Sequence, residues 1–378
     1  MKTRGRLGRS AAAAVVAACA ALALSLAASA GADDPVATTA DAADRLVVGV
    51  VPQRSLQDGE PRRMAGAGID SVRFMVSWAS VERNRDVYDW TPVDRTVREF
   101  AAAGLTTFPF LYGSPDWAAQ RDRFACGGGG CFTHAPASIE TRHAFARFAG
   151  AAVRRYGPGG TFWDDHPELP ERPIRAWQIW NEPNLERYFK PDPDTSDYAD
   201  IVRRASAEIK AADPDADVVL GGLFGPKSTA KMDGARRFLK QLYREPGIAE
   251  SFDGVAVHPY SPTARGVLDQ IRAVKRVARG RDADVDLWIT EIGWASHGRR
   301  DQNLVKSPRL QAEMLRRTFT RFARRADRWG LKGVFWFAWR DTARRNPVCA
   351  WCPGAGLVSR NGSPKRAFRE LRRLTRVR

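Results

Sequence analysis

From residue 46 onward the chain alternates short apolar runs, rich in β-branched and aromatic residues, with longer stretches of helical character. The strand-like runs cover residues 46–51, 71–77, 106–112, 174–180, 218–222, 252–258, 285–291 and 333–339. Helix starts are marked where Thr or Ser precedes Pro, as at Thr91-Pro92 and Ser307-Pro308, because Pro fits the first turn of a helix. Strands that alternate with helices predict a series of β/α units and a parallel sheet.

Eight such units are the number that closes into a barrel through right-handed crossovers. We therefore predict an α/β fold, a (β/α)8 TIM barrel, formed as a single domain by residues 45–378. An open, doubly wound sheet is the alternative architecture for the same alternation. No glycine-rich phosphate loop follows the first strand-like run, which disfavours a dinucleotide-binding protein.

Residues 1–30 have the composition of a secretory signal peptide. A basic start without acidic residues is followed by an Ala-, Val- and Leu-rich core at 11–27 and by the A-x-A cleavage signal Ala28-Ser29-Ala30. We predict cleavage after Ala30, a flexible leader at 31–44, a secreted protein, and no transmembrane segment in the mature chain. A lipoprotein cleavage box ending at Cys19 is disfavoured, because the apolar run continues past that residue.

The mature chain keeps four cysteines: Cys126, Cys131, Cys349 and Cys352. Export makes disulfides their default state, and three pairings are possible. Sequence proximity favours Cys126–Cys131 and Cys349–Cys352, each of which closes a short loop. A zinc site built from all four thiolates stays open as an alternative, although only one pair has the C-x-x-C spacing.

The chain is strongly basic, with 60 Lys and Arg residues against 43 Asp and Glu and a net charge of +17. Its arginines are spread over predicted helix faces, for example at Arg203-Arg204 and Arg316-Arg317, as expected of a solvated surface. Such a surface also attracts polyanions, so an anionic cell-surface polymer is a candidate partner. No motif with interleaved aromatic residues indicates nucleic-acid binding, and we expect no nucleic-acid partner.

Two short strings place a carboxylate where a strand gives way to a loop. Trp-Asn-Glu-Pro-Asn at 180–184 puts Glu182 after the fourth strand-like run, and Thr-Glu-Ile-Gly-Trp at 290–294 puts Glu291 at the end of the seventh. The carboxyl ends of all strands of a barrel face one mouth, where the active sites of this architecture lie. We therefore expect the two carboxylates to converge on one pocket.

Each glutamate also has a structural reading. Glu291 shares its parity with Leu287 and Ile289, so it faces the barrel interior if those two residues do. A carboxylate there is either functional or partnered, and Arg73 on the second strand is the candidate partner. For Glu182 the alternative is an exposed glutamate in a loop.

The two strings together resemble the clan A glycoside hydrolases, and are most similar to family 39 and to the neighbouring family 5-like (β/α)8 glycosidases. The resemblance extends over residues 45–378. It implies that Glu182 is the general acid/base and Glu291 the nucleophile of a retaining glycosidase, whose two carboxyl groups lie about 5–5.5 Å apart. This chemistry requires no metal and no organic cofactor.

The same resemblance implies substrate contacts for five further residues. Asn181 matches the residue that hydrogen-bonds the sugar 2-hydroxyl, and Arg73 matches a second-strand arginine near the nucleophile. His258 and Tyr260 match the His-x-Tyr pair that closes the sixth strand, in which the tyrosine orients the nucleophile. Trp339 matches the eighth-strand aromatic residue that floors the subsite of the sugar being cleaved.

These residues predict a secreted retaining glycoside hydrolase that cleaves β-linked O-glycosidic bonds in a polysaccharide or oligosaccharide by double displacement. The pKa of Glu182 must then be raised, by burial and by the neighbouring anion, for it to donate a proton near neutral pH. The main alternative is a non-catalytic barrel that binds glycan or cell wall in the same cleft. A third reading is an adhesion protein driven by the basic surface.

Overall fold

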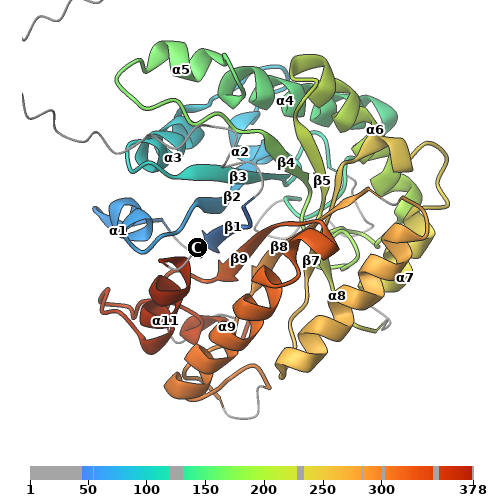
Figure 1. Ribbon diagram of the computed structural model, residues 1–378. Helices are drawn as coiled ribbons and strands as arrows, with labels where there is room; N and C mark the ends of the chain where they lie inside the picture. Colours follow the sequence, from blue (N-terminus) through green and yellow to red (C-terminus); the bar gives the residue numbers. More distant parts are fainter. Residues whose placement is uncertain are drawn as a thin grey trace, which may run out of the picture. The chain divides into compact units, whose positions relative to one another are not determined.

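The computed structural model describes residues 45–53, 55–119, 131–227, 234–282, 284–299, 303–343 and 349–376. Strands lie at the centre and helices surround them (Figure 1). The strands are β1 (Val47–Val51), β2 (Ser71–Ser77), β3 (Thr106–Tyr112), β4 (Ala176–Ile179), β5 (Asp217–Leu220), β6 (Leu223–Phe224), β7 (Gly254–His258), β8 (Asp286–Ile292) and β9 (Leu331–Phe337). The α-helices are α1 (Glu60–Gly66), α2 (Trp78–Val81), α3 (Thr91–Ala101), α4 (Ile139–Tyr156), α5 (Thr161–Asp165), α6 (Thr195–Ala212), α7 (Ala235–Leu242), α8 (Ala264–Arg279), α9 (Pro308–Ala323), α10 (Ala326–Trp329) and α11 (Arg366–Thr375). Short 3-10 helices lie at Ala249–Ser251 and Cys352–Gly354.

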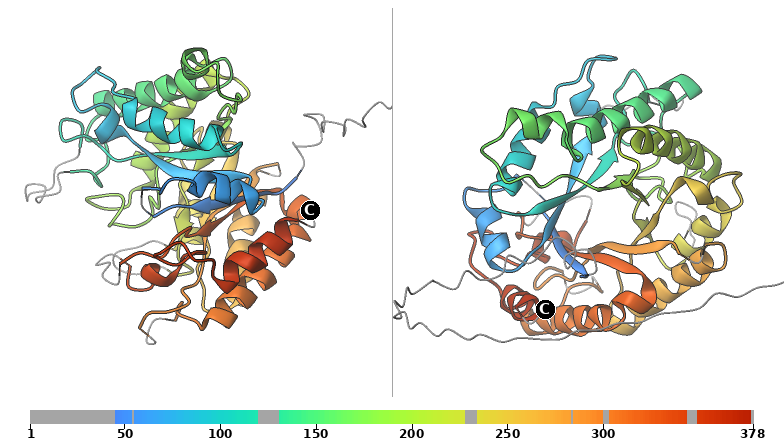
Figure 2. Two further views of the ribbon diagram at one scale, coloured as in Figure 1. Left: turned by 90° about the vertical axis from the view of Figure 1, so that its left-hand side faces the viewer. Right: turned by 45° about the horizontal axis from the view of Figure 1, so that its top comes forward.

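The strands form one parallel sheet that closes on itself. Their order is β5-β4-β3-β2-β1-β9-β8-β7-β6, and β1 pairs with both β2 and β9. The ring is closed where Val219 of β5 pairs with Gly254 of β7. The predicted (β/α)8 TIM barrel is therefore confirmed, and the right-hand view of Figure 2 shows its helices as a ring around the strands.

The structure has two short strands, β5 and β6, where the sequence predicts one strand at 218–222. β5 ends at Leu220 and β6 begins at Leu223, with two glycines between them. A Cβ atom at Gly222 would lie 2.0 Å from Nε2 of His258. Glycine at this point therefore leaves room for the imidazole at the end of β7.

Apolar side chains form a layer on each side of the closed sheet. The inner layer fills the barrel, and consists of Val51, Phe108, Val219, Ala256, Trp288 and Phe335. In it the rings of Phe108 and Trp288 stack with their centres 4.7 Å apart. The outer, larger layer lies between the strands and the helices, where for example Trp336 of β9 packs on Phe319 of α9. Alternate residues of each strand thus serve one layer or the other.

The predicted helix starts are partly confirmed. Ser307 caps α9 by accepting a hydrogen bond from the backbone N–H of Leu310, and Pro308 is the first residue of this helix. At α3 the cap position is Trp90, so Thr91 is the first helical residue and not the cap. The same Ser-Pro pattern at Ser363-Pro364 predicts the start of the last helix, but this helix begins at Arg366, and Pro364 pairs with Val358 in an isolated β-bridge.

The described residues all belong to one compact unit, Asp44–Arg378. The predicted signal peptide at 1–30 and leader at 31–44 lie outside the described residues. Among the helices that the structure describes, none has both the length and the apolar character needed to cross a bilayer.

The predicted Cys349–Cys352 disulfide is present, with 5.4 Å between the two Cα atoms. Cys131 is also disulfide-bonded. Its predicted partner, Cys126, lies outside the described residues. With Cys349, Cys352 and Cys131 in disulfides, the alternative of a zinc site built from free thiolates is wrong.

Candidate active site

The carboxyl ends of the strands surround a cleft of about 850 Å³. Asn181 and Glu182 enter it directly after β4, Tyr260 enters it after β7, and Glu291 lies near the end of β8. Aromatic residues of β9 and of the loop after it also line the cleft. The strand ends that the sequence singled out therefore meet in one cavity at the mouth of the barrel.

Glu182 is presented by a sharp turn after β4. The backbone is left-handed at Trp180 (φ 68°) and again at Glu182 (φ 46°), a conformation that costs a non-glycine residue on the order of 1–3 kcal/mol. Asn184, at the end of the same string, holds the turn by pairing its side-chain amide with the backbone N–H and carbonyl of Phe224 on β6. Glu182 is only 7% exposed, so the alternative of an exposed loop glutamate is wrong.

Glu291 reaches the cleft because β8 contains a β-bulge. Ile289 is opposite Val334 of β9, whereas Ile292 is opposite Trp336. β8 therefore advances by three residues where β9 advances by two. Such an extra residue re-aims the side chains beside it, and bulges are frequent next to active sites.

The premise that Leu287 and Ile289 face the barrel interior is wrong. Leu287 and Ile289 pack in the outer layer against the helices, and Trp288 fills the barrel interior. Unbroken alternation would turn Glu291 outward with Leu287 and Ile289. The bulge interrupts the alternation, so that Thr290 and Glu291 both form hydrogen bonds with residues at the barrel mouth.

Arg73 of β2 is the central cation of the site and is completely buried. Its Nη1 donates to Oε1 of Glu291 at 2.7 Å, and its Nη2 donates to Oδ1 of Asn181 at 2.8 Å. Its Nε donates to Oε1 of Gln178 on β4 at 3.1 Å. One face of the guanidinium lies over Phe110, with 4.2 Å from its central carbon to the ring centre. The predicted ion pair between Arg73 and Glu291 thus exists, and the same arginine fixes Asn181 beside it.

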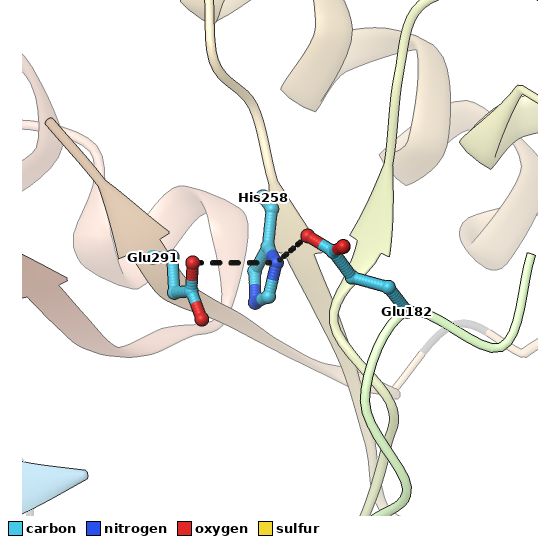
Figure 3. A group of neighbouring side chains, drawn as sticks. All are labelled: Glu182, His258 and Glu291. Carbon is cyan, nitrogen blue, oxygen red and sulfur yellow. Dashed lines mark hydrogen bonds and ion pairs between the residues drawn. The ribbon is translucent and has the colours of Figure 1, made fainter. Parts of the chain in front are cut away.

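His258 lies between the two glutamates (Figure 3). Its Nδ1 is 2.7 Å from Oε1 of Glu182 and 3.8 Å from Oε2 of Glu291, and its Nε2 is 3.0 Å from Oγ1 of Thr290. The hydroxyl of Tyr260 donates to Oε2 of Glu291 at 2.9 Å. Both oxygens of Glu291 are therefore held, one by Arg73 and the other by Tyr260.

The surroundings shift the pKa values of the two carboxyls in opposite directions. Burial raises the pKa of Glu182, and the negative charge of Glu291 adds to this rise, although His258 and Arg73 offset part of it. Burial would also raise the pKa of Glu291, but the charges of His258 and Arg73 and the hydrogen bonds from Tyr260 and Arg73 outweigh it. The pKa of Glu291 is thereby lowered below its ordinary value. At a pH between the two pKa values, Glu182 holds a proton and Glu291 is an anion.

An oxygen of Glu182, an oxygen of Glu291 and a ring nitrogen of His258 all lie within 4.8 Å of one another. Three such groups are a possible ligand set for a metal ion. The buried guanidinium of Arg73, 2.7 Å from Glu291, already supplies the positive charge that a cation would bring. The donor set therefore fits a charge-compensated carboxylate pair better than a metal centre.

Trp339 does not lie in the cleft, and its predicted position beneath the substrate is wrong. It is fully buried, its indole N–H donates to Oε1 of Glu60, and its ring packs on Phe368 of α11. The prediction extended the last strand to residue 339, whereas β9 ends at Phe337. Phe337 has the inward parity of Phe335, and it is Phe337 that lines the cleft.

The structure therefore brings together six of the seven candidate residues: Glu182, Glu291, Asn181, Arg73, His258 and Tyr260. Sequence reasoning missed Gln178 and Thr290, which position Arg73 and His258. Gln178 had a signal, because an amide in the otherwise apolar run of β4 needs a buried partner. Trp351, another cleft residue, lies in the loop after β9, and no strand pattern pointed to it.

Comparison with solved structures finds glycoside hydrolases. A family 39 glycoside hydrolase from the gut symbiont Bacteroides cellulosilyticus WH2 matches with a TM-score of 0.63 at 19% identity, covering 89% of this chain and 64% of that chain. A monomeric β-xylosidase from Caulobacter crescentus CB15 matches with a TM-score of 0.61 at 18% identity, covering 87% and 67%. A GH5_18 protein from Bifidobacterium longum subsp. infantis matches with a TM-score of 0.60 at 16% identity, covering 88% and 79%.

The chain thus shares its fold with glycoside hydrolases of families 39 and 5. The predicted resemblance is confirmed at this level. The chain spans about two thirds of the length of the first two structures. No protein-family model and no curated protein sequence matches it.

Proposed function

We propose that the protein is a secreted retaining glycoside hydrolase that cleaves β-linked glycosidic bonds in an oligosaccharide or polysaccharide. The observation that carries the proposal is the carboxyl pair of buried Glu182 and partly buried Glu291, with oxygens within 4.8 Å across a cleft and pKa values shifted in opposite directions. Inverting enzymes keep their carboxyls about 6.5–9.5 Å apart to admit a water molecule, so the short separation supports retention.

In the first step Glu291 attacks the anomeric carbon and forms a glycosyl ester. The C–O bond to the leaving group breaks, and Glu182 gives its proton to the departing oxygen. Arg73 and Tyr260 keep Glu291 ionised and aimed before the attack. Asn181, anchored by Arg73, presents its amide to the sugar.

In the second step water replaces the leaving group. Glu182 is now a carboxylate and takes a proton from the water, whose oxygen attacks the anomeric carbon from the side that the leaving group vacated. The ester bond breaks and returns Glu291 as an anion, so the product keeps the β configuration. Glu182 changes from neutral to negatively charged between the two steps, and His258, which contacts it, stabilises the charged form.

Two further observations support the finer parts of the proposal. One structural neighbour is described as a β-xylosidase, which favours a β-linked substrate. The signal-like residues 1–30 and the Cys349–Cys352 disulfide favour export. We extend the proposal to the basic surface, which would hold the exported protein near anionic cell-surface polymers.

A panel of aryl β-glycosides of xylose, glucose, mannose and galactose tests the activity, with proton NMR to follow the anomer that is released first. We expect hydrolysis of at least one member with initial release of the β anomer. Glu291→Gln is the control, and should bind the same sugar without turnover. Initial release of the α anomer would refute retention. Binding without hydrolysis by the wild-type protein would favour the non-catalytic barrel instead.

A further inference from the structure

The cleft has one aromatic wall that comes from outside the barrel strands. Trp351 lies in the loop after β9 and lines the same cavity as Glu182 and Glu291. We propose that Trp351, fixed in place by the Cys349–Cys352 disulfide, is a stacking platform for a pyranoside ring bound beside Glu291. This inference rests on the proposed function and adds a binding subsite that depends on an oxidised disulfide.

The ring contacts of Trp351 fix its position relative to the reacting groups. Its centre lies 5.0 Å from that of Tyr260, with 64° between the ring planes, and 5.8 Å from that of Phe337, with 61° between the planes. Tyr260 in turn donates its hydroxyl to Glu291. Trp351 is therefore one residue removed from the nucleophile. Neither contact is a parallel stack, so neither of the two neighbouring rings lies flat against the indole of Trp351.

The indole N–H of Trp351 differs from those of Trp294 and Trp336, which both donate to backbone carbonyls inside the protein. Trp294 donates to the carbonyl of Ser261, and Trp336 donates to the carbonyl of Ala355. In the part of the chain that the structure describes, the N–H of Trp351 has no such acceptor. A partly exposed indole with an unused donor suits a ligand that offers both apolar C–H groups and hydroxyls, as a pyranose does.

The disulfide explains how a loop can hold an aromatic wall in place. It spans only two intervening residues, Ala350 and Trp351, and so restricts the backbone that carries the indole. Cys352 is buried, and its carbonyl accepts a hydrogen bond from the side chain of Gln53, just after β1, at 3.1 Å. Cys352 thus anchors the loop to the barrel, and the S–S bond ties Cys349 to this anchor.

The cleft also identifies the kind of ligand surface that fits. The lining of the cavity combines the aromatic rings of Phe337 and Trp351 with the polar groups of Asn181 and the two glutamates. A β-pyranoside with equatorial hydroxyls has C–H groups that can lie against the aromatic rings and a rim of hydroxyls that can bind the polar groups. We therefore expect xylo- or gluco-configured units to gain most from Trp351.

The test compares Trp351→Ala and Trp351→Phe with the wild-type protein on its best aryl glycoside and on the matching oligosaccharide. We expect Trp351→Ala to raise KM about 10-fold with kcat changed by less than about threefold, and Trp351→Phe to recover part of the loss. Trp90→Phe is the matched control, because Trp90 packs on Phe148 and Tyr156 between α3 and α4, away from the cleft. An unchanged KM in Trp351→Ala would overturn the inference.

The role of the disulfide is tested by the Cys349→Ser, Cys352→Ser double variant, since a chemical reductant would also reach the disulfide of Cys131. We expect KM to rise in the same direction as in Trp351→Ala. In the combined variant that lacks both the disulfide and Trp351, we expect no further rise, because both changes remove one interaction. Fully additive effects would show that the disulfide does not act through Trp351.

A separate binding measurement distinguishes this inference from the proposed function. In the Glu291→Gln background, titration with xylo-, cello- and manno-oligosaccharides should show weaker binding when Trp351 is Ala. If the wild-type protein hydrolyses nothing but Trp351→Ala weakens binding, the proposed function fails and the stacking platform stands. If none of these oligosaccharides binds, the platform is refuted as well.

Discussion

Carboxylates gather at both ends of the barrel, but the two groups differ in how their charge is compensated. At the mouth, Glu182 and Glu291 face each other across the cleft. At the opposite end, Asp217, Asp253 and Asp286 lie at the amino ends of β5, β7 and β8. The carboxylates at the base therefore lie where β5, β7 and β8 begin. Strand β8 connects the two groups, because Asp286 is its first residue and Glu291 lies near its other end.

The cations beside the two clusters are of different kinds. At the mouth, fully buried Arg73 binds Glu291 at 2.7 Å and also holds Asn181. At the base, Lys210 and Lys332 are 35% and 46% exposed, and lie 3.0 Å from Asp253 and 3.5 Å from Asp286. An exposed lysine is screened by water, whereas a buried guanidinium is not.

The pKa values follow from this difference. Burial, with the added charges of Asp253 and Asp286, raises the pKa of Asp217 to about 6, and burial also raises that of Asp286. At the mouth the pKa of Glu182 is raised and that of Glu291 is lowered. A carboxyl whose pKa is only raised destabilises the folded state when it ionises. A pair whose pKa values are separated can act as acid and nucleophile at the same pH.

The largest expected effect is on kcat, and it distinguishes the carboxylates at the two ends of β8. We expect Glu291→Gln to lower kcat by about 10⁴-fold or more, because the glycosyl ester cannot form. Asp286→Asn, which removes a carboxylate from the other end of β8, should leave kcat within about twofold. Initial rates on the best aryl glycoside measure both. A loss of similar size in Asp286→Asn would erase the distinction between mouth and base.

Arg73→Met removes the cation that distinguishes the mouth. It removes the donor from Oε1 of Glu291 and from the side-chain oxygens of Asn181 and Gln178, so we expect a loss of about 3–5 kcal/mol in unfolding free energy. The pKa of Glu291 should rise towards its ordinary value. Urea unfolding and the acid limb of the pH profile measure the two effects. Lys210→Met is the control at the base and should cost less than about 1 kcal/mol, because Lys210 is partly exposed.

The pH dependence of kcat/KM should be bell-shaped in the wild-type protein. Activity falls on the acid side as Glu291, whose lowered pKa lies below 4.5, takes up a proton. It falls on the alkaline side as Glu182, whose raised pKa lies above 4.5, loses its proton. Glu182→Gln should abolish the alkaline limb and keep the acid limb. Survival of the alkaline limb in that variant would assign it to another group.

Asp217→Asn should give the smallest effect and the opposite sign. The folded-state pKa of about 6 exceeds the ordinary value of 3.8, so ionisation disfavours the folded state as the pH rises between these values. The variant should therefore be more stable than the wild type by about 1 kcal/mol at pH 7, and equal to it near pH 4. Urea unfolding at the two pH values decides this. A destabilised variant at pH 7 would show that the carboxylate is well partnered.

The sequence was sufficient to predict the fold and the meeting of the two glutamates at the barrel mouth. Eight strand-like runs separated by helical stretches predict the barrel, and each run lies within a few residues of the observed strand. Glu182 and Glu291 follow from strings at strand ends, because all parallel strands of a barrel end at one mouth. Neither step required the exact position of a side chain.

The sequence could not supply details that depend on one-residue changes of register. The bulge in β8 turns Glu291 to the interior, although plain alternation places it with Ile289 in the outer layer. Strand β9 ends at Phe337, two residues earlier than predicted. The aromatic residue of this strand that lines the cleft is therefore Phe337 and not Trp339. Trp351 was missed because its place depends on how a disulfide folds a loop, and no periodicity reports that.

The central claim is that Glu182 donates the proton and Glu291 forms the ester, and azide tests it most directly. Each of Glu182→Ala and Glu291→Ala is supplied with azide and with the best aryl glycoside that has an activated leaving group. In Glu182→Ala the ester still forms and azide attacks it from the vacated side, so the account predicts the β-glycosyl azide. In Glu291→Ala azide takes the place of the nucleophile, which predicts the α-glycosyl azide. The same anomer from both variants, or the reverse assignment, would contradict it.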